Sequence, residues 1–126
     1  MNNIYIMSAT RSAIGTFGGT LKDFSPVDLG TLVAKEAIER SDFQAEEISH
    51  AVFGNVIHTE PRDMYVSRVI ALQSGMKKDS AAFTVNRLCG SGLQSIVSAV
   101  QLIAMEDTEL ALAGGVEVMS LSLIHI

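Results

Sequence analysis

The sequence predicts an α/β fold in which strands and helices alternate as βαβαβαβ along the chain. Two observations carry this prediction. Short apolar segments rich in strand-forming residues recur, and between them lie longer segments whose apolar residues repeat every three or four positions. Strands joined through helices favour parallel pairing and right-handed crossovers. We therefore expect three layers, with a mainly parallel sheet covered by helices on both faces.

Two strands are expected in the first half of the chain. The segment Asn3–Ser8 (NIYIMS) is short, apolar and β-forming, and predicts the first strand. The glycine-rich stretch Gly15–Gly19 follows as a loop. The segment His50–Phe53 (HAVF), which ends at Gly54, predicts the second strand.

Helix-start signals lie between these two strands. Ser25 offers a capping hydroxyl, Pro26 suits the first helical position, and Asp28 favours the helix dipole. We expect the helix to end near Arg40. Its apolar stripe contains Leu29, Leu32, Val33, Ala37 and Ile38.

The second half repeats the alternation. A helix is expected after Pro61 and before Gly75, which suits a carboxy-terminal cap. Ala81–Val85 (AAFTV) predicts the third strand, and Glu109–Ala113 (ELALA), ended by two glycines, predicts the fourth. Between them runs the most regular helical stripe in the chain, formed by Leu93, Ile96, Val97, Val100 and Ile103.

Composition excludes several functional classes. The 126 residues suit one domain, and 48% hydrophobic residues argue against disorder. With 9 basic and 14 acidic residues and no basic cluster, no nucleic-acid partner is expected. No apolar run approaches the ~18 residues of a membrane span, and no signal peptide is evident, so a cytoplasmic location is expected. One cysteine and three scattered histidines predict no metal site.

The most informative segment is NRLCGSGLQ, which directly follows the third strand and opens the last helix. Ligands of open α/β sheets bind at the carboxyl ends of strands, and helix N-termini stabilise negative charge. Cys89 at this turn is therefore a candidate thiolate nucleophile. Gly90 and Gly92 would let an acyl group approach the sulfur, so Gly92→Val is expected to crowd the turn and to disfavour a left-handed conformation.

Each candidate has a simpler structural interpretation. A free cysteine is commonly a small buried hydrophobe. Ser91 lacks the glycines of a hydrolase elbow, since Cys89 and Leu93 occupy those positions, and is expected to be a helix-turn or packing residue. Surface or strand-edge roles are expected for His50 and His58.

The segment NRLCGSGLQSI resembles the active-site block of thiolases, the acetyl-CoA acyltransferases. Residues 59–65 look most similar to bacterial β-ketothiolases. Resemblance extends from about Ile4 to Ser120. Further blocks that resemble the family lie in register at residues 9–15, 17–19, 52–56 and 113–120.

The resemblance implies a specific chemistry. Cys89 would attack an acyl-CoA thioester and carry the acyl group, for condensation or for thiolytic cleavage of 3-ketoacyl-CoA. The Cys89 N–H would contribute to an oxyanion hole. Coenzyme A thioesters would be substrates, with no cofactor and no metal. The family's third strand, here near Ala81–Asn86, pairs with its copy across a two-fold axis, which implies a homodimer or tetramer.

The same resemblance implies that residues 1–120 are an incomplete amino-terminal half-domain. Thiolases place an activating histidine, a second cysteine and a water-holding asparagine in their carboxy-terminal half. We therefore expect these 126 residues alone to be inactive. The apolar tail 121–126, which includes His125, departs from the family's pattern, and an assembly artefact and a truncated record both stay open as explanations.

Three other functions stay open on the sequence. The chain could serve as a noncatalytic dimerising or binding module, because every downstream catalytic group of the family is absent from it. A related condensing enzyme such as a ketoacyl synthase also sets a cysteine at a strand–helix turn, although NRLCGSGLQ favours a thiolase. The last alternative is that Cys89 senses redox conditions, although the chain contains no second cysteine that could form a disulfide with it.

Overall fold

The protein folds around a parallel sheet of three strands, β1 (His50–Gly54), β2 (Ala81–Val85) and β3 (Ala111–Gly115). The structure is a computed structural model that describes residues 3–122. β1 lies in the centre, and its first residue is in register with Ala81 on one side and Ala111 on the other. The predicted α/β class and parallel pairing are confirmed.

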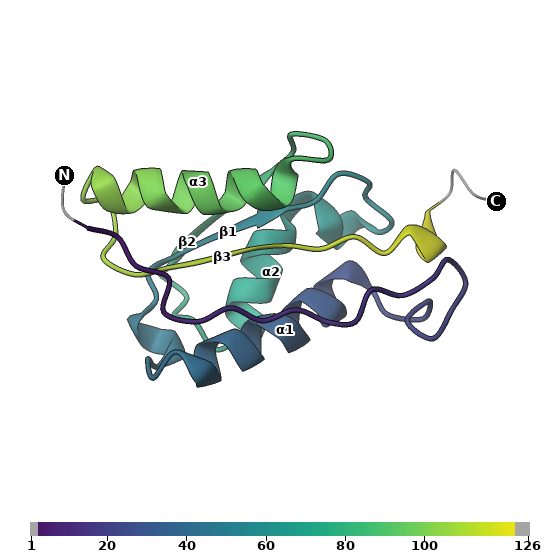
Figure 1. The fold of residues 1–126 in the computed structure, drawn as a ribbon, viewed down its shortest axis with the longest axis horizontal. Coiled ribbons are helices and arrows are strands. Elements are labelled where there is room, and N and C mark those ends of the chain that lie inside the picture. Colours follow the sequence, from purple (N-terminus) through teal and green to yellow (C-terminus); the bar gives the residue numbers. More distant parts are fainter. Residues whose placement is uncertain (1–2, 123–126) are drawn as a thin grey trace.

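Three α-helices cover the sheet: α1 (Pro26–Arg40), α2 (Val66–Gln73) and α3 (Ser91–Ala104). Figure 1 shows α3 on one face and α1 and α2 on the other, which confirms the three layers. The chain passes from β1 through α2 to one edge strand, then through α3 to the opposite edge strand. Right-handed crossovers in opposite directions place their helices on opposite faces.

The first helix begins at the predicted capping residues. Ser25 is extended, and its hydroxyl oxygen accepts a hydrogen bond from the Asp28 N–H at 3.1 Å. Pro26 occupies the first turn, where a backbone N–H would have no helical partner. In the predicted apolar stripe Ile38 is buried, whereas Leu32 is 58% exposed. The buried face of the helix is therefore rotated slightly about the helix axis relative to the predicted stripe.

The second helix begins later than Pro61. A 3-10 turn, η2 (Pro61–Tyr65), comes first, and α2 starts at Val66. Its end is as expected, because Gly75 follows the last turn with a φ of +98°, a conformation that glycine adopts without a side-chain clash. Two further 3-10 turns are η1 (Ala45–Glu47) and η3 (Met119–Leu121).

The main core lies between the sheet and the layer formed by α1 and α2. The last four residues of β1 are all buried, as a central strand covered on both faces requires. Burial of each large apolar side chain here contributes roughly 1.5–3 kcal/mol. The core consists of Val27, Ala34, Ile38, Ile48, Ala51, Phe53, Val66, Ile70, Ala71, Met76 and Leu112.

The helix α3 packs on the opposite face through small residues. Its buried positions are Ser91, Ser95 and Ala99, spaced four residues apart. The apolar stripe that marks the helix in the sequence is largely exposed, with Leu93 at 69%. Small side chains let the helix backbone approach the sheet closely, which brings the start of α3 directly over the strand ends.

The predicted strand Asn3–Ser8 is wrong. This segment forms no strand and instead follows α1, where the Ser8 hydroxyl donates to the Ala37 carbonyl at 2.7 Å and the Thr10 hydroxyl donates to the Val33 carbonyl at 3.1 Å. A hollow of about 890 Å³ is lined both by residues 3–17 and by β3. Figure 1 shows the segment in purple, running beside α1. Among the described residues the sheet therefore has three strands, where four were expected.

The strand predicted at Glu109–Ala113 lies two residues further along. The two glycines expected to end it, Gly114 and Gly115, belong to β3. An added Cβ at Gly114 would lie 2.6 Å from Cε1 of Phe53, and one at Gly115 would lie 3.2 Å from the Cα of Gly92. Gly114 therefore permits close packing on Phe53 of β1, and Gly115 permits close packing on the first turn of α3; neither forms a turn.

Of the tail 121–126, the structure describes Leu121, which ends η3, and Ser122, which is buried. The remaining tail residues, with His125, lie outside the described residues.

No helix among the described residues is long and apolar enough to cross a bilayer. Residues 3–122 also contain no cluster of three metal-ligating side chains.

Candidate active site

Cys89 lies where the sequence predicts, in the turn between the end of β2 and the start of α3. Its side chain is exposed, so the interpretation as a small buried hydrophobe is wrong. The turn projects from the carboxyl edge of the sheet, where α/β proteins bind ligands. In Figure 1 it is the loop that precedes the green helix α3.

Hydrogen bonds from Ser91 hold the turn. Its Oγ accepts from the Arg87 N–H at 2.8 Å and donates to the Leu88 carbonyl at 2.7 Å. Ser91 is only 4% exposed, which confirms its expected role in the turn and leaves its hydroxyl unsuited to attack a substrate. Leu88 is held at a φ of +50°, and its N–H donates to Oδ1 of Asn86 at 3.0 Å.

A helix amino terminus and an arginine lie close to Cys89 in the sequence. It lies immediately before Gly90, the residue that caps the amino terminus of α3, where helical N–H groups and the dipole favour anions. Arg87 lies two residues away and donates to the neutral Gln94 side chain at 2.6 Å. Within residues 3–122 Arg87 forms no salt bridge with a carboxylate, so its positive charge is not neutralised by a close acidic partner.

The expectation for Gly92→Val is wrong in both of its reasons. Gly92 is not left-handed, and an added Cβ would meet nothing within 4 Å. The glycine that close packing requires is Gly54, at the end of β1, where an added Cβ would lie 2.7 Å from the Ser91 carbonyl carbon and oxygen. The sequence pattern predicts that a glycine is required in the turn at position 92, whereas the structure requires one at position 54, at the end of β1.

Neither of the two described histidines, His50 and His58, is hydrogen-bonded to Cys89. His50 begins β1, at the amino edge of the sheet, far along the strand direction from the turn. His58 is exposed in the loop after β1 and makes no hydrogen bond to another described residue. The expected surface role of His58 is confirmed, whereas His50 is partly buried at the start of the central strand, with its Nε2 buried.

His50 makes stability depend on pH. Its ring packs on Phe83 with centroids 5.7 Å apart, and burial lowers its pKa below the ordinary 6.5, against a smaller opposing effect of Asp107. The unfolded chain therefore binds the proton more readily, so stability is lost as pH falls through 6.5 towards the lower folded-state pKa. We expect His50→Gln to remove this loss.

The measurement is the free energy of unfolding in urea at several values between about pH 5 and 8. His58→Gln is the matched control, because it also removes one imidazole but from an exposed loop. An unchanged pH dependence in His50→Gln contradicts the assignment to His50.

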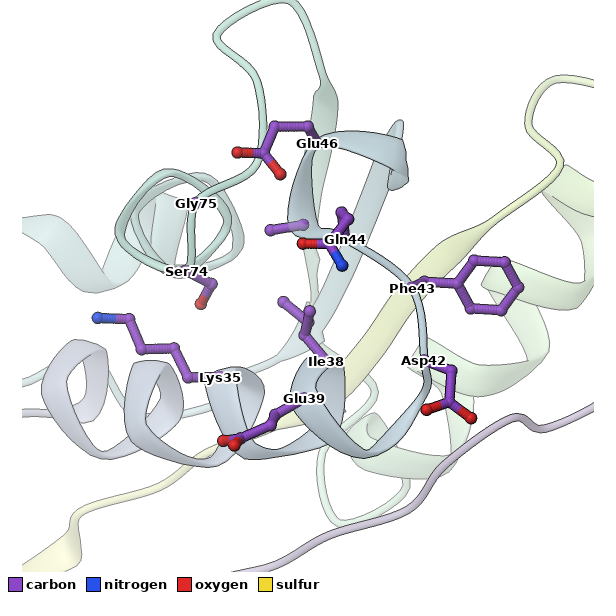
Figure 2. A pocket seen from close by; sticks show the side chains of 10 residues that line it. Lys35, Ile38, Glu39, Asp42, Phe43, Gln44, Glu46, Ser74 and Gly75 are labelled. Carbon is purple, nitrogen blue, oxygen red and sulfur yellow. The ribbon is translucent and has the colours of Figure 1, made fainter.

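A second hollow lies away from Cys89. A depression of about 570 Å³ lies at the carboxyl ends of α1 and α2. Figure 2 shows that charges of both signs line it, among them Lys35, Glu39 and Glu46. The helix α2 connects the parallel strands β1 and β2 and runs opposite to them, so its carboxyl end lies at the amino edge of the sheet. The depression is therefore separate from the candidate active site.

Two polar residues near the turn had no role in the sequence interpretation. Asn55 directly follows β1 and is 1% exposed, and Glu117 follows β3. The Asn55 side-chain Nδ2 donates to Oε1 of Glu117 at 2.7 Å. A polar residue immediately after a fully buried strand is a signal that could have identified Asn55.

Comparison with known proteins decides the family. The model of the thiolase amino-terminal domain matches residues 4–125. The chain belongs to the thiolase family. This thiolase chain is 55% identical over 117 residues to beta-ketothiolase BktB of Cupriavidus necator, covering 93% of this chain and 30% of that protein. The expected similarity to a bacterial β-ketothiolase is confirmed.

Other relatives agree. Human mitochondrial 3-ketoacyl-CoA thiolase is 38% identical over 120 residues, which are 95% of this chain and 30% of that protein. Its crystal structure in complex with CoA superposes with a TM-score of 0.90 at 39% identity, covering 92% of this chain and 29% of that one. Bacillus anthracis acetyl-CoA acetyltransferase gives 0.84 at 36% identity, covering 91% and 29%. The thiolase chain thus spans about 30% of the length of the relatives it matches.

Proposed function

We propose that Cys89 is the acyl-accepting nucleophile of a thiolase reaction. Its thiolate attacks the carbonyl carbon of an acyl-CoA, the bond to the coenzyme A sulfur breaks, coenzyme A leaves as the thiolate, and a thioester to Cys89 forms. The single observation that carries this proposal is the exposed Cys89 at the amino terminus of α3, on the carboxyl edge of the sheet, in a chain of this family. A covalent intermediate divides the transfer into two easier steps.

The acyl group then has two fates. The carbanion of a second acyl-CoA attacks it in condensation, or coenzyme A attacks it in thiolysis of a 3-ketoacyl-CoA. Support comes from relatives named beta-ketothiolase and 3-ketoacyl-CoA thiolase and from a relative's structure with CoA. Both directions need proton transfer, and neither described histidine is bonded to Cys89. The complete reaction therefore needs groups outside residues 3–122.

A chimaera tests the proposal. It joins residues 1–120 of this chain to the part of the Cupriavidus necator β-ketothiolase beyond the aligned region. We expect the chimaera to thiolyse a 3-ketoacyl-CoA in the presence of coenzyme A, and the 126-residue chain alone to show no turnover. A folded but inactive chimaera contradicts the proposed function, and turnover by the chain alone contradicts the expectation that further groups are needed.

One observation favours the noncatalytic dimerising module as a second candidate. β2 is an edge strand whose Ala81 and Phe83 are exposed, so its outer backbone is open to pairing with another strand. Size-exclusion chromatography of the chain at several concentrations distinguishes the candidates, because a concentration-dependent dimer without turnover in the chimaera supports the module alone. The homo-oligomeric state and the cytoplasmic location stay predictions.

A further inference from the structure

One buried side chain connects the carboxyl ends of the three strands. Asn55 continues from β1, its backbone N–H donates to the Val85 carbonyl at the end of β2 at 3.2 Å, and its Nδ2 donates to the Val116 carbonyl after β3 at 2.9 Å. With 1% of its surface exposed, Asn55 has little freedom to move. It therefore fixes the relative positions of the strand ends at the edge where the Cys89 turn begins.

Glu117 completes this connection from the side of β3. Its carboxylate accepts from Nδ2 of Asn55 at 2.7 Å and from the backbone N–H groups of Val56 and Ile57 at 3.1 Å. Hydrogen bonds to an ionised acceptor are stronger than neutral ones. Glu117 forms no salt bridge with a basic residue within residues 3–122. Its negative charge therefore strengthens the hydrogen bonds from the segment that follows β1.

The connection reaches Cys89 through Asn86. Val85, which accepts from the Asn55 N–H, is followed by Asn86, whose Oδ1 accepts from the Leu88 N–H at 3.0 Å. Leu88 is left-handed at a φ of +50°, a conformation that a leucine adopts only when its surroundings hold it. Because Leu88 precedes Cys89, its dihedral angles orient the Cys89 backbone from which the side chain projects.

The two hydrogen bonds of the Asn55 side-chain amide fix its orientation. The Nδ2 group donates to the Val116 carbonyl and to Glu117, so the amide cannot be reversed without the loss of both bonds. The Asn55 side chain therefore imposes one geometry on the segments that follow β1 and β3.

We propose that Asn55 and Glu117 are positioning residues that hold the strand ends beneath the Cys89 turn and so fix the direction of the nucleophile. The consequence for acyl transfer rests on the proposed function of Cys89. The positioning itself is measurable without any acyl transfer, because the Leu88 N–H is protected from exchange only while the turn keeps its conformation.

The experiment combines two readouts on Glu117→Ala. Amide hydrogen exchange of Leu88, followed by NMR on the 126-residue chain, is expected to speed up by about tenfold or more. Acetylation of Cys89 by acetyl-CoA in the chimaera, followed by mass spectrometry, is expected to slow by a similar factor. Glu117→Gln keeps one acceptor oxygen but loses the charge, so both effects are expected to be smaller than in Glu117→Ala and still measurable. Glu109→Ala removes an exposed carboxylate elsewhere and is expected to change neither.

Unchanged Leu88 exchange in a folded Glu117→Ala chain overturns the positioning role, whatever the acetylation result. If Glu117→Ala does not fold, Glu117→Gln decides: a measurable rise in Leu88 exchange supports the proposal, and none overturns it. Absence of Cys89 acetylation in the unsubstituted chimaera overturns the proposed function instead, so the two failures are distinguishable.

Discussion

Cys89→Ser in the chimaera is expected to lower the thiolysis rate by at least about a thousandfold. A serine hydroxyl is far less ionised than a thiol at neutral pH, and no described histidine is bonded to position 89 to activate it. The fold is expected to be unaffected, because the side chain is exposed and the two residues are similar in size. The measurement is the initial rate of 3-ketoacyl-CoA cleavage at saturating coenzyme A.

Two comparisons accompany this prediction. The free energy of unfolding of Cys89→Ser is expected to stay within about 0.5 kcal/mol of the parent protein, as for most exposed substitutions. Cys89→Ala is expected to be as slow as Cys89→Ser. A Cys89→Ser variant that keeps a tenth or more of the parent rate rules out Cys89 as the nucleophile.

Gly54→Ala is expected to destabilise the chain by about 2–3 kcal/mol and to slow acylation of Cys89. The added methyl group would lie 2.7 Å from backbone atoms of Ser91, so the start of α3 must move away from β1. Backbone cannot yield as the end of a flexible side chain can. Urea unfolding measures the first effect, and the rate of Cys89 acetylation in the chimaera measures the second.

Gly92→Ala is the matched control for this substitution. It adds the same methyl group to the residue next to Ser91, the clash partner, at a position where the new Cβ meets nothing within 4 Å. We expect a change in unfolding free energy of less than about 1 kcal/mol, since helix propensity favours alanine over glycine. Equal destabilisation by the two substitutions contradicts the close approach of Gly54 to Ser91.

The sequence predicted the site better than it predicted the sheet. Capping residues at Ser25, the short strands at residues 50 and 81, and the strand–helix turn around Cys89 depend on local chemistry, and the structure contains all of them. Local patterns specify these features because the residues that form them are close in sequence. The position of Cys89 could therefore be predicted, whereas its exposure required the structure.

Features that depend on distant contacts were not predictable in the same way. Composition predicts a strand at Asn3–Ser8, but strand formation needs a neighbouring edge, and this segment is bonded to α1 instead. The regular apolar stripe correctly predicts α3, yet periodicity does not say which face packs on the sheet, and the small residues do. The two glycines of β3 suggest a turn in the sequence. Only the structure shows that Gly114 packs against the ring of Phe53.

The connection made by Asn55 and Glu117 was missed for the same reason. The two residues are 62 positions apart and meet because β1 and β3 are paired neighbours in the sheet. Both lie in blocks that resemble the thiolase family, but a resemblance in sequence assigns no hydrogen bonds. Strand order, which decides the contact, is known only from the structure.

The most direct test of the central claim is the identity of the acylated residue. The chimaera is incubated with acetyl-CoA, quenched in acid and digested, and the peptides are sequenced by mass spectrometry. We predict one acetyl group on the peptide that contains Cys89, located on the cysteine and absent from Cys89→Ala. An acetyl group found on another residue, or on none, contradicts the assignment of Cys89 as the nucleophile.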